Sequence, residues 1–235
     1  MFEAGRRAFL SADYKKAGEA FEKAVAADPR NSDYNLWLGR AYGRRAETAS
    51  VFTAPGLASK ARQHFEKAVE LNPRNGEALN DLFDYYVEAP GFLGGGFDKA
   101  EALIAKISAV DAAEGHYAQA QLLDRRKQFD EAEQHLRRAL DLAPRQVGRV
   151  LDLASYLSKR GRVDESEKEF EAAQKMAPNN PKVLYTRAET YVRDHRNLDK
   201  AKKLLQQYLS TANLSADDPP RAKAEDLLKK ATSGA

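Results

Sequence analysis

The sequence predicts an all-α protein in which pairs of helices repeat along the chain. The main support is a block with a small residue, a large residue four positions later, a second small residue three further on, and a proline near the end. The clear copies are Ala17, Phe21, Ala24 and Pro29; Ala61, Phe65, Ala68 and Pro73; Ala132, Leu136, Ala139 and Pro144; and Ser166, Phe170, Ala173 and Pro178. Weaker copies start at Ala100 and Ala201. A pattern with a nearly fixed period indicates a repeat array, whose units cannot bury their apolar faces alone.

The composition fits a globular chain and excludes several kinds of chemistry. The 235 residues include 38 basic and 35 acidic side chains, for a net charge of +3, and no cysteine. Without cysteine there can be no disulfide, thiolate metal ligand or cysteine nucleophile. Because charges of both signs are mixed along the sequence, we expect no nucleic-acid partner. No apolar run approaches the roughly 20 residues of a membrane-spanning helix, so we expect no membrane insertion.

The second helix of each repeat, helix B, carries the recurring block. Its small and large residues fall on one stripe of a helix, so they are expected to face the core. The proline cannot continue helix B, and it starts the next unit. Aspartates mark the start of most B helices, where they can cap free N–H groups and favour the positive end of the helix. These aspartates are Asp13, Asp98, Asp130, Asp164 and Asp199.

The first helix, helix A, carries a matching small residue and aromatic, most clearly as Leu38, Gly39 and Tyr42. Together the two helices resemble the tetratricopeptide repeat, whose signature of about 34 residues has Leu-Gly-x2-Tyr, Ala-x3-Phe and Pro. The resemblance implies a right-handed superhelix (α-solenoid) of six helix pairs in a single domain over 1–235. Its copies fall at about 1–31, 32–75, 76–112, 113–146, 147–180 and 181–213.

Departures from the period are the features particular to this chain. The step from Ala17 to Ala61 is ten residues longer than 34, and the step from Ala61 to Ala100 is five longer. Both insertions fall between helices A and B, at about 44–60 and 88–98, and insertions of this kind map to one edge of a solenoid. The Pro-Gly-Phe-Leu-Gly-Gly-Gly stretch that begins at Pro90 resembles one in uncharacterised bacterial tetratricopeptide repeat proteins. That resemblance implies a bacterial origin and no defined activity.

The two ends of the array differ. Asp218, Pro219 and Pro220 are helix-start signals, so we expect a capping helix at about 216–231 that covers the last repeat. Met1 falls near the fourth position of its repeat, which suggests a first helix shortened by removal of a leader peptide. This favours the bacterial periplasm over the cytoplasm. The uncapped first repeat could also stack on another molecule, so self-association is an alternative.

A search for reaction chemistry finds no catalytic or cofactor motif. The glycines at 94–96 are followed by Phe97 rather than Lys-Ser/Thr, and helix rather than strand precedes them, so a helix-breaking loop is favoured over a phosphate site. The four histidines lack metal-ligand spacing. His64 and His135 share one repeat position, which suggests a role at the packing edge. We therefore expect no enzyme, no cofactor and no metal.

The concave surface of the array remains as the candidate site. In tetratricopeptide repeats it is lined by helix A, and repeat position alone selects seven contact candidates: Trp37, Arg40, Asn80, Asp81, Asp84, Tyr117 and Tyr185. Trp37 lies two residues after the usual core aromatic, about 200° around the helix, so it should point away from the pair interface. An exposed aromatic beside arginines suits a peptide anchor. The alternative is that Trp37 packs beneath the first insertion.

These observations favour a non-enzymatic scaffold that binds a peptide segment or a helix of another protein in its groove. Arg6, Arg40 and Arg44 face acids at Glu77 and the positions that follow, so binding should depend on salt. A self-associating structural protein and the regulatory subunit of an enzyme complex are the alternatives. Acids at two matching positions, Glu77 and Asp81, argue against the acidic chaperone tails that some members of the family hold.

Overall fold

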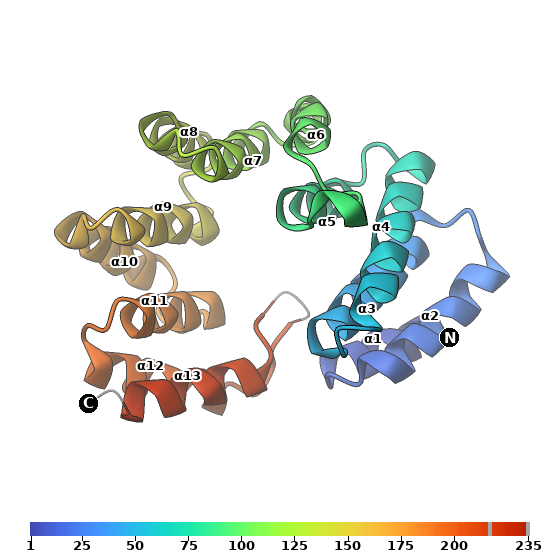
Figure 1. Ribbon diagram of the computed structural model, residues 1–235. Coiled ribbons are helices and arrows are strands. Elements are labelled where there is room, and N and C mark those ends of the chain that lie inside the picture. The colour runs from blue at the N-terminus through green and yellow to red at the C-terminus, as the bar shows by residue number, and fades with distance from the viewer. Residues whose placement is uncertain (216–217, 234–235) are drawn as a thin grey trace. The chain divides into compact units, whose positions relative to one another are not determined.

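The computed structural model describes residues 1–215 and 218–233, and Figure 1 shows them as helices joined by short connections. These residues contain thirteen α-helices, one 3-10 helix and no strand. The elements are α1 (Phe2–Leu10), α2 (Tyr14–Ala27), α3 (Ser32–Thr48), α4 (Ala54–Leu71), α5 (Gly76–Glu88), η1 (Gly91–Leu93), α6 (Phe97–Val110), α7 (Ala112–Arg125), α8 (Phe129–Leu142), α9 (Val147–Lys159), α10 (Val163–Met176), α11 (Pro181–Arg193), α12 (Leu198–Ser210) and α13 (Arg221–Ser233). The all-α helical repeat fold is confirmed.

Packing divides the chain into two compact units, unit 1 over Met1–His135 and unit 2 over Leu136–Ala235. Odd-numbered helices up to α11 are the A helices, and the even-numbered helices are the B helices. Within unit 1 the A helices α1, α3 and α5 pack on their own B helices, and contacts between A helices join α1 to α3, α3 to α5 and α5 to α7. Within unit 2 the same side contact joins α9, α11 and α13. The single domain expected over 1–235 stays a prediction.

The small and large residues of every clear copy of the recurring block are buried, as predicted, and the prolines are exposed. Phe21 and Phe170 are fully buried, and the alanines around them are at most 3% exposed. Burying one such ring stabilises the fold by roughly 1.5–3 kcal/mol. Ser166 takes the place of an alanine in one copy, and its buried hydroxyl donates a hydrogen bond to the Ala154 carbonyl oxygen at 2.7 Å. That bond removes the cost of burying a polar group.

The signature glycine of helix A marks a close approach between the paired helices. A Cβ atom added at Gly39 in α3 would lie 2.6 Å from Cε1 of Phe65 in α4 and 3.2 Å from the Ala61 carbonyl oxygen. Gly5 stands in the same relation to Phe21, at 2.5 Å. Only a residue without a side chain lets these rings pack directly on the helix backbone.

The aromatic of helix A ties each repeat to the one before it. The Tyr42 hydroxyl donates to Glu22 on α2 at 2.5 Å, and the Tyr86 hydroxyl donates to Glu66 on α4 at 2.9 Å. In unit 2 a tyrosine on α11 makes the same kind of bond to α10. Such bonds give the otherwise apolar interfaces between repeats a fixed register.

Of the five aspartates expected to cap B helices, Asp13 alone makes a capping hydrogen bond within the described residues. Asp13 accepts a hydrogen bond from the backbone N–H of Lys16 and caps α2. Asp98, Asp164 and Asp199 instead lie inside the first turns of α6, α10 and α12, and Asp130 lies in the first turn of α8. In the first turn their negative charge still interacts favourably with the positive end of the helix, but they make no capping hydrogen bond. The apolar residue before each aspartate begins the helix, which the sequence pattern placed outside it.

The two insertions take different forms. Most of residues 44–60 lengthens α3 and α4, which leaves only 49–53 as a connection. The second insertion forms η1 and a glycine turn. Gly94 has φ +89°, and a Cβ atom at Gly95 would lie 1.8 Å from the Ala89 carbonyl oxygen. These glycines therefore shape a tight turn, in line with the loop that the sequence favoured, and η1 packs on α4.

The C-terminal helix covers the last repeat as expected. Ala224 and Ala231 are fully buried against α11 and α12, with Leu227 and Leu228 packed beside them. The helix begins at Arg221, later than the predicted start. Residues 216 and 217 of the predicted helix lie outside the described residues.

Candidate functional site

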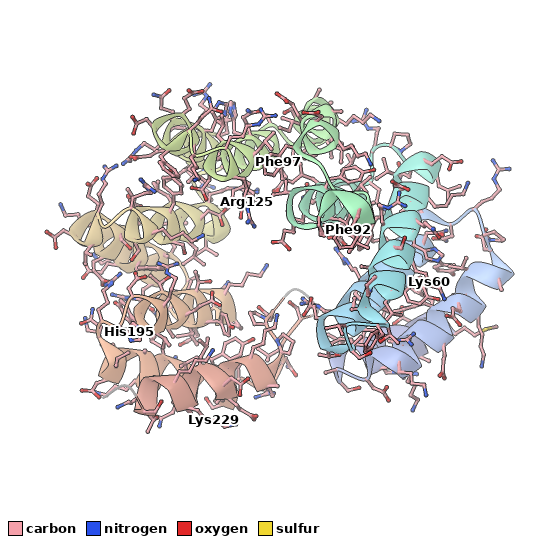
Figure 2. All side chains as sticks on the ribbon, viewed as in Figure 1. Lys60, Phe92, Phe97, Arg125, His195 and Lys229 are labelled. Atoms are coloured by element: carbon pink, nitrogen blue, oxygen red, sulfur yellow. The ribbon has the colours of Figure 1, made fainter. Side chains whose placement is uncertain are left out.

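One face of unit 1 is built by its A helices, and contacts join its side chains from α1 to α7. We call it the A-helix face, and define it by Arg6, Trp37, Arg40, Asn80, Asp81, Asp84, Glu88, Glu114, Tyr117 and Arg125. Arg6 and Arg40 flank the Trp37 ring, and Arg40 pairs with Asp81 on α5. Further along, Glu88 on α5 lies 3.6 Å from Arg125, which Figure 2 labels on α7. The face is thus continuous across four helices.

Trp37 is buried, so the expectation of an exposed aromatic at this position is wrong. It is 9% exposed and packs on Phe9 at 5.4 Å and Phe21 at 5.8 Å between ring centroids. The other edge of the ring meets Phe2 at 6.3 Å. It does not depend on the first insertion either, because these partners belong to α1 and α2. In an array, the side of α3 that faces away from α4 meets the preceding repeat rather than solvent.

Two arginines cover the remaining surface of the Trp37 ring. The guanidinium carbons of Arg6 and Arg40 each lie 5.2 Å from the ring centroid. Such a cation–π contact contributes about 0.5–2 kcal/mol, depending on how dry it is. A partner on this face would therefore meet guanidinium groups above the indole rather than the indole itself.

Arg40 is held by two carboxylates of the next repeat. Its Nε lies 2.5 Å from Asp81 Oδ2, and its Nη1 lies 2.9 Å from Glu77 Oε2. The Arg40 side chain is only 17% exposed, so the pair with Asp81 is largely shielded from solvent. A shielded pair of this kind positions α3 against α5, and a ligand can displace it only at a cost.

Asp84 is an exposed acid of this face and forms no ion pair within the described residues. Desolvation, and then the carboxylates of Asp81, Glu88 and Glu114, raise the pKa of its carboxyl to about 7. The Asp84 side chain is itself exposed to solvent. The desolvation of its carboxyl therefore arises from protein atoms in the wider surroundings and not from atoms packed directly against it. Water around the carboxyl screens part of this effect. The upward direction of the pKa follows from the three acids near Asp84, which forms no ion pair within the described residues.

Asn80 and Tyr117 lie on the same side of the repeat pairs and are half-buried. Both have side-chain surface that a partner can reach. The A-helix face carries an excess of negative charge, because its four acids outnumber its three arginines. The acids are Asp81, Asp84, Glu88 and Glu114, and the arginines are Arg6, Arg40 and Arg125.

Tyr185 does not join the other candidates. It lies on α11 in unit 2, is 6% exposed, and packs on the Tyr208 ring with 5.3 Å between centroids. Burial raises its pKa. Its place in the core of the last repeat leaves little surface for a partner, so the expectation that it lines a groove is not carried forward.

Unit 2 contains a charged cluster that the sequence did not reveal. Glu167 on α10 accepts hydrogen bonds from Arg187 at 3.0 Å, Tyr191 at 2.7 Å and Arg196 at 2.5 Å. Burial opposes ionisation of Glu167, but these donors prevail and lower its pKa. The partners lie 20 to 29 residues away in sequence, so no local spacing marks them. The cluster fastens α10 to α11 and to the turn after it.

The histidines serve packing in unit 1. His64 stacks on Tyr42 at 5.7 Å and bonds to Asn35, while His116 and His135 approach within 2.9 Å through their Nδ1 atoms. This agrees with the packing-edge role expected for His64 and His135. Within the described residues, no cluster of three or more His, Cys, Asp or Glu side chains is arranged to hold a metal ion. No helix in that part of the chain is long and apolar enough to span a bilayer.

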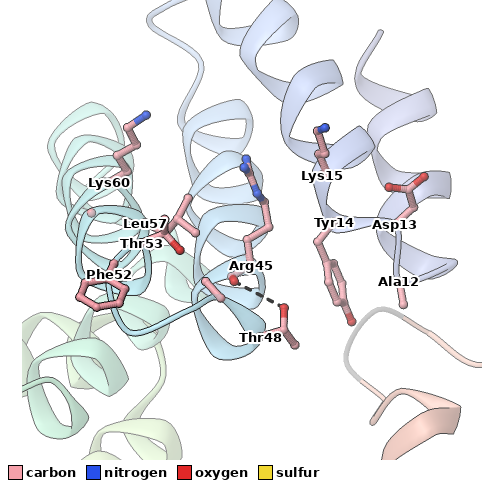
Figure 3. Close-up of a pocket in the computed structure, with 12 residues that line it drawn as sticks. Ala12, Asp13, Tyr14, Lys15, Arg45, Thr48, Phe52, Thr53, Leu57 and Lys60 are labelled. Carbon is pink, nitrogen blue, oxygen red and sulfur yellow. Dashed lines mark hydrogen bonds between the residues drawn. The ribbon is translucent and has the colours of Figure 1, made fainter.

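A pocket between α2, α3 and α4 is a second feature that sequence reasoning missed. Figure 3 shows it between the α1–α2 turn and the connection that starts α4. Its volume is about 750 Å³. The first insertion was the one sequence feature that could have indicated this pocket, because residues 44–60 supply most of its lining.

Antiparallel helix pairs with buried small-large-small blocks define the class of α-helical repeat proteins. Two models described as tetratricopeptide repeat match residues 94–147 and 125–189. These matches support a tetratricopeptide repeat protein, as the sequence signature implied. The family consists of protein-interaction modules, so an interaction role is the general function that the fold supports.

Solved structures agree with this fold. A thermophilic tetratricopeptide repeat protein from Thermus thermophilus is similar with a TM-score of 0.62 and 21% identity, over 81% of this chain and 97% of that one. A tetratricopeptide repeat protein from Parabacteroides merdae is similar with a TM-score of 0.57 and 16% identity, over 98% of this chain and 97% of that one. At these identities the likeness shows the fold alone. No curated protein sequence matches the chain.

Proposed function

We propose that this protein is a scaffold whose A-helix face in unit 1 binds a basic segment of another protein. The observation that carries the proposal is Asp84, an exposed carboxylate without an ion pair among other acids. A lysine or arginine of a partner that approached Asp84 would relieve the repulsion among these carboxylates. The energy released favours a cationic ligand over an anionic or neutral one.

Neighbouring residues would complete the contact. Asn80 can donate and accept hydrogen bonds from its amide, and Tyr117 offers an aromatic surface with a hydroxyl. Arg40 pairs with both Asp81 and Glu77, so these residues would lie at the edge of the site rather than anchor the ligand. Trp37 forms the buried floor beneath Arg40.

The proposal predicts that binding depends on pH in a defined direction. Between pH 6 and pH 8 the ionised fraction of a carboxyl with a pKa of about 7 rises from about a tenth to about nine tenths. Affinity for a basic peptide should therefore rise several-fold over this interval, because only the carboxylate attracts a cation. Added salt should weaken binding, since much of the attraction is electrostatic.

The experiment uses fluorescein-labelled peptides that alternate Arg with Leu, and matched peptides with Glu in place of Arg. Fluorescence anisotropy reports binding, and Trp37, the only tryptophan, gives a second signal because Arg40 lies on its ring. Asp84→Asn should weaken binding of the Arg peptide and remove most of the pH dependence of that binding. Glu171→Gln, which removes an exposed acid of α10 in unit 2, is the matched control.

Three results would count against the proposal. The first is equal affinity of the Arg and Glu peptides for the unmodified protein. The second is unchanged binding of the Arg peptide by Asp84→Asn. The third is light scattering that shows peptide-independent assembly whose surface includes Asp84, because self-association would then explain the exposed acids.

A further inference from the structure

The pocket of Figure 3 exists because of the first insertion. Twelve residues line it, of which eight lie within 44–60 and four belong to the α1–α2 turn and the start of α2. The extra turns of α3 and α4 project beyond a repeat of ordinary length, and α2 closes the other side. At about 750 Å³ the pocket falls within the range of ligand-binding pockets, about 300–1,000 Å³.

The rim of the pocket holds large apolar side chains in water. Phe52 is 92% exposed, and Leu57 lies half-buried inside the pocket. Val51, next to Phe52 in the sequence, is 80% exposed and does not line the pocket. The Thr53 N–H donates to the Ser50 carbonyl oxygen at 3.0 Å, so a hydrogen-bonded turn fixes the connection. Phe52 is exposed because this turn holds it outward. An aromatic ring held outward beside a pocket can contact an apolar side chain of a partner without any rearrangement.

The charge of the pocket is positive. Lys15, Arg45 and Lys60 line it, and none of them forms an ion pair within the described residues. The one acid in the lining is Asp13, whose carboxylate already accepts the capping bond from the Lys16 N–H. Figure 3 shows the three cationic side chains pointing to one side of the pocket, away from the Phe52 ring.

Lys60 and Arg45 also lie against an aromatic ring, which limits their freedom. Lys60 Nζ is 5.2 Å and Arg45 Cζ is 5.7 Å from the centroid of the Tyr42 ring. Burial of Tyr42, and then its hydrogen bond to Glu22, raise the pKa of its hydroxyl to about 12, so this ring stays neutral between the cations at ordinary pH. Neither cation forms an ion pair, and two positioned cations of this kind favour carboxylates on a ligand.

We propose that this pocket is a second docking site, which takes an acidic segment of a partner protein anchored by one large apolar side chain. The apolar anchor would contact Phe52 and Leu57, and carboxylates beside it would meet Lys15, Arg45 and Lys60. A pocket of about 750 Å³ has room for an inserted side chain, and a flat lipid surface offers no such group. No lining residue belongs to the A-helix face, so the two sites differ in place and in the charge that they select.

The test begins with a random dodecapeptide display library selected on the full chain. Peptides that bind the unmodified protein are counter-selected on Phe52→Ser, a change at an exposed side chain that leaves the core intact. We expect the peptides lost on Phe52→Ser to share one aromatic or aliphatic residue flanked by Asp or Glu. A synthesised member should lose about tenfold in affinity with Phe52→Ser and with Lys60→Glu.

Matched controls separate the pocket from the rest of unit 1. Phe92→Ser changes a phenylalanine that is 83% exposed in the second insertion, and Lys106→Glu reverses an exposed charge on α6. Both should leave the selected peptide bound. Asp84→Asn should leave it bound as well, which keeps this result independent of the basic-segment proposal.

Several outcomes would overturn the inference. The library would yield no peptide that depends on Phe52, or the dependent peptides would be basic or without acids. Alternatively, vesicles containing phosphatidylserine would sediment the unmodified protein but not Phe52→Ser, and acidic peptides would fail to compete. That last result would assign the exposed ring to a membrane surface.

Discussion

Replacing Gly39 by alanine tests whether the repeat signature encodes a close helix approach. The new methyl group would lie 2.6 Å from Cε1 of Phe65, and the Ala61 carbonyl oxygen at 3.2 Å limits how far α3 can shift. Phe65 is 7% exposed, so its ring has little room to move. Overpacking of this kind costs about 1–3 kcal/mol. The same change gains roughly 0.5–1 kcal/mol in helix propensity, so Gly39→Ala should be destabilising or, at the low end, neutral.

Gly43 provides the control on the same helix. A Cβ atom there would meet nothing within 4 Å, so Gly43→Ala should keep only the propensity gain of about 0.5–1 kcal/mol. The two variants should therefore differ by about 1–3 kcal/mol in the free energy of unfolding. Urea titrations followed by circular dichroism measure this difference. The reasoning fails if Gly39→Ala is as stable as Gly43→Ala.

Two further predictions concern pH and register. Burial, and then the neighbouring His116, lower the pKa of His135, so the folded state favours the neutral ring. The stability that the neutral His135 ring contributes is therefore present above about pH 6.5 and is lost as the pH falls through the pKa of His135 in the folded state. His135→Gln should flatten the decline of the urea midpoint between pH 7 and pH 5, and an unchanged decline would refute this origin. Tyr86→Phe removes the hydrogen bond to Glu66 and should cost about 0.5–1.5 kcal/mol. Tyr34→Phe should leave the free energy of unfolding nearly unchanged in the same urea titration, because the Tyr34 hydroxyl makes no hydrogen bond within the described residues. Equal losses of stability in Tyr86→Phe and Tyr34→Phe would contradict a role of the Tyr86 hydrogen bond in fixing the register between repeats.

The two proposals assign to unit 1 two binding surfaces of opposite charge. The A-helix face is acidic around Asp84, while the pocket built by the first insertion presents unpaired Lys15, Arg45 and Lys60. A scaffold with two faces of opposite charge can hold a basic and an acidic segment at the same time. Near-neutral overall composition conceals this, because the net charge of +3 averages over separate surfaces. Such separation provides selectivity, since each face repels the ligand of the other.

Local spacing was enough to predict the helices, their pairing and the family. The recurring block, the signature glycine at Gly39 and the capping helix each follow from which residues share one side of a helix. The side chains of Ala17, Phe21 and Ala24 are buried as their spacing requires. This works because helix periodicity is a property of neighbouring residues, and burial of one stripe is common to every repeat.

What lies around each helix was decided only by the tertiary structure. The sequence placed Trp37 on the side of α3 that faces away from α4, but only the packing of α1 and α2 shows that this side meets Phe9 and Phe21. Partners such as Arg40 and Asp81 are 41 residues apart, and spacing within a helix cannot pair them. The sequence also marked residues 44–60 as unusual without indicating the pocket. Contacts between repeats depend on how three or four helices meet, and that arrangement determines which surfaces remain open to a partner.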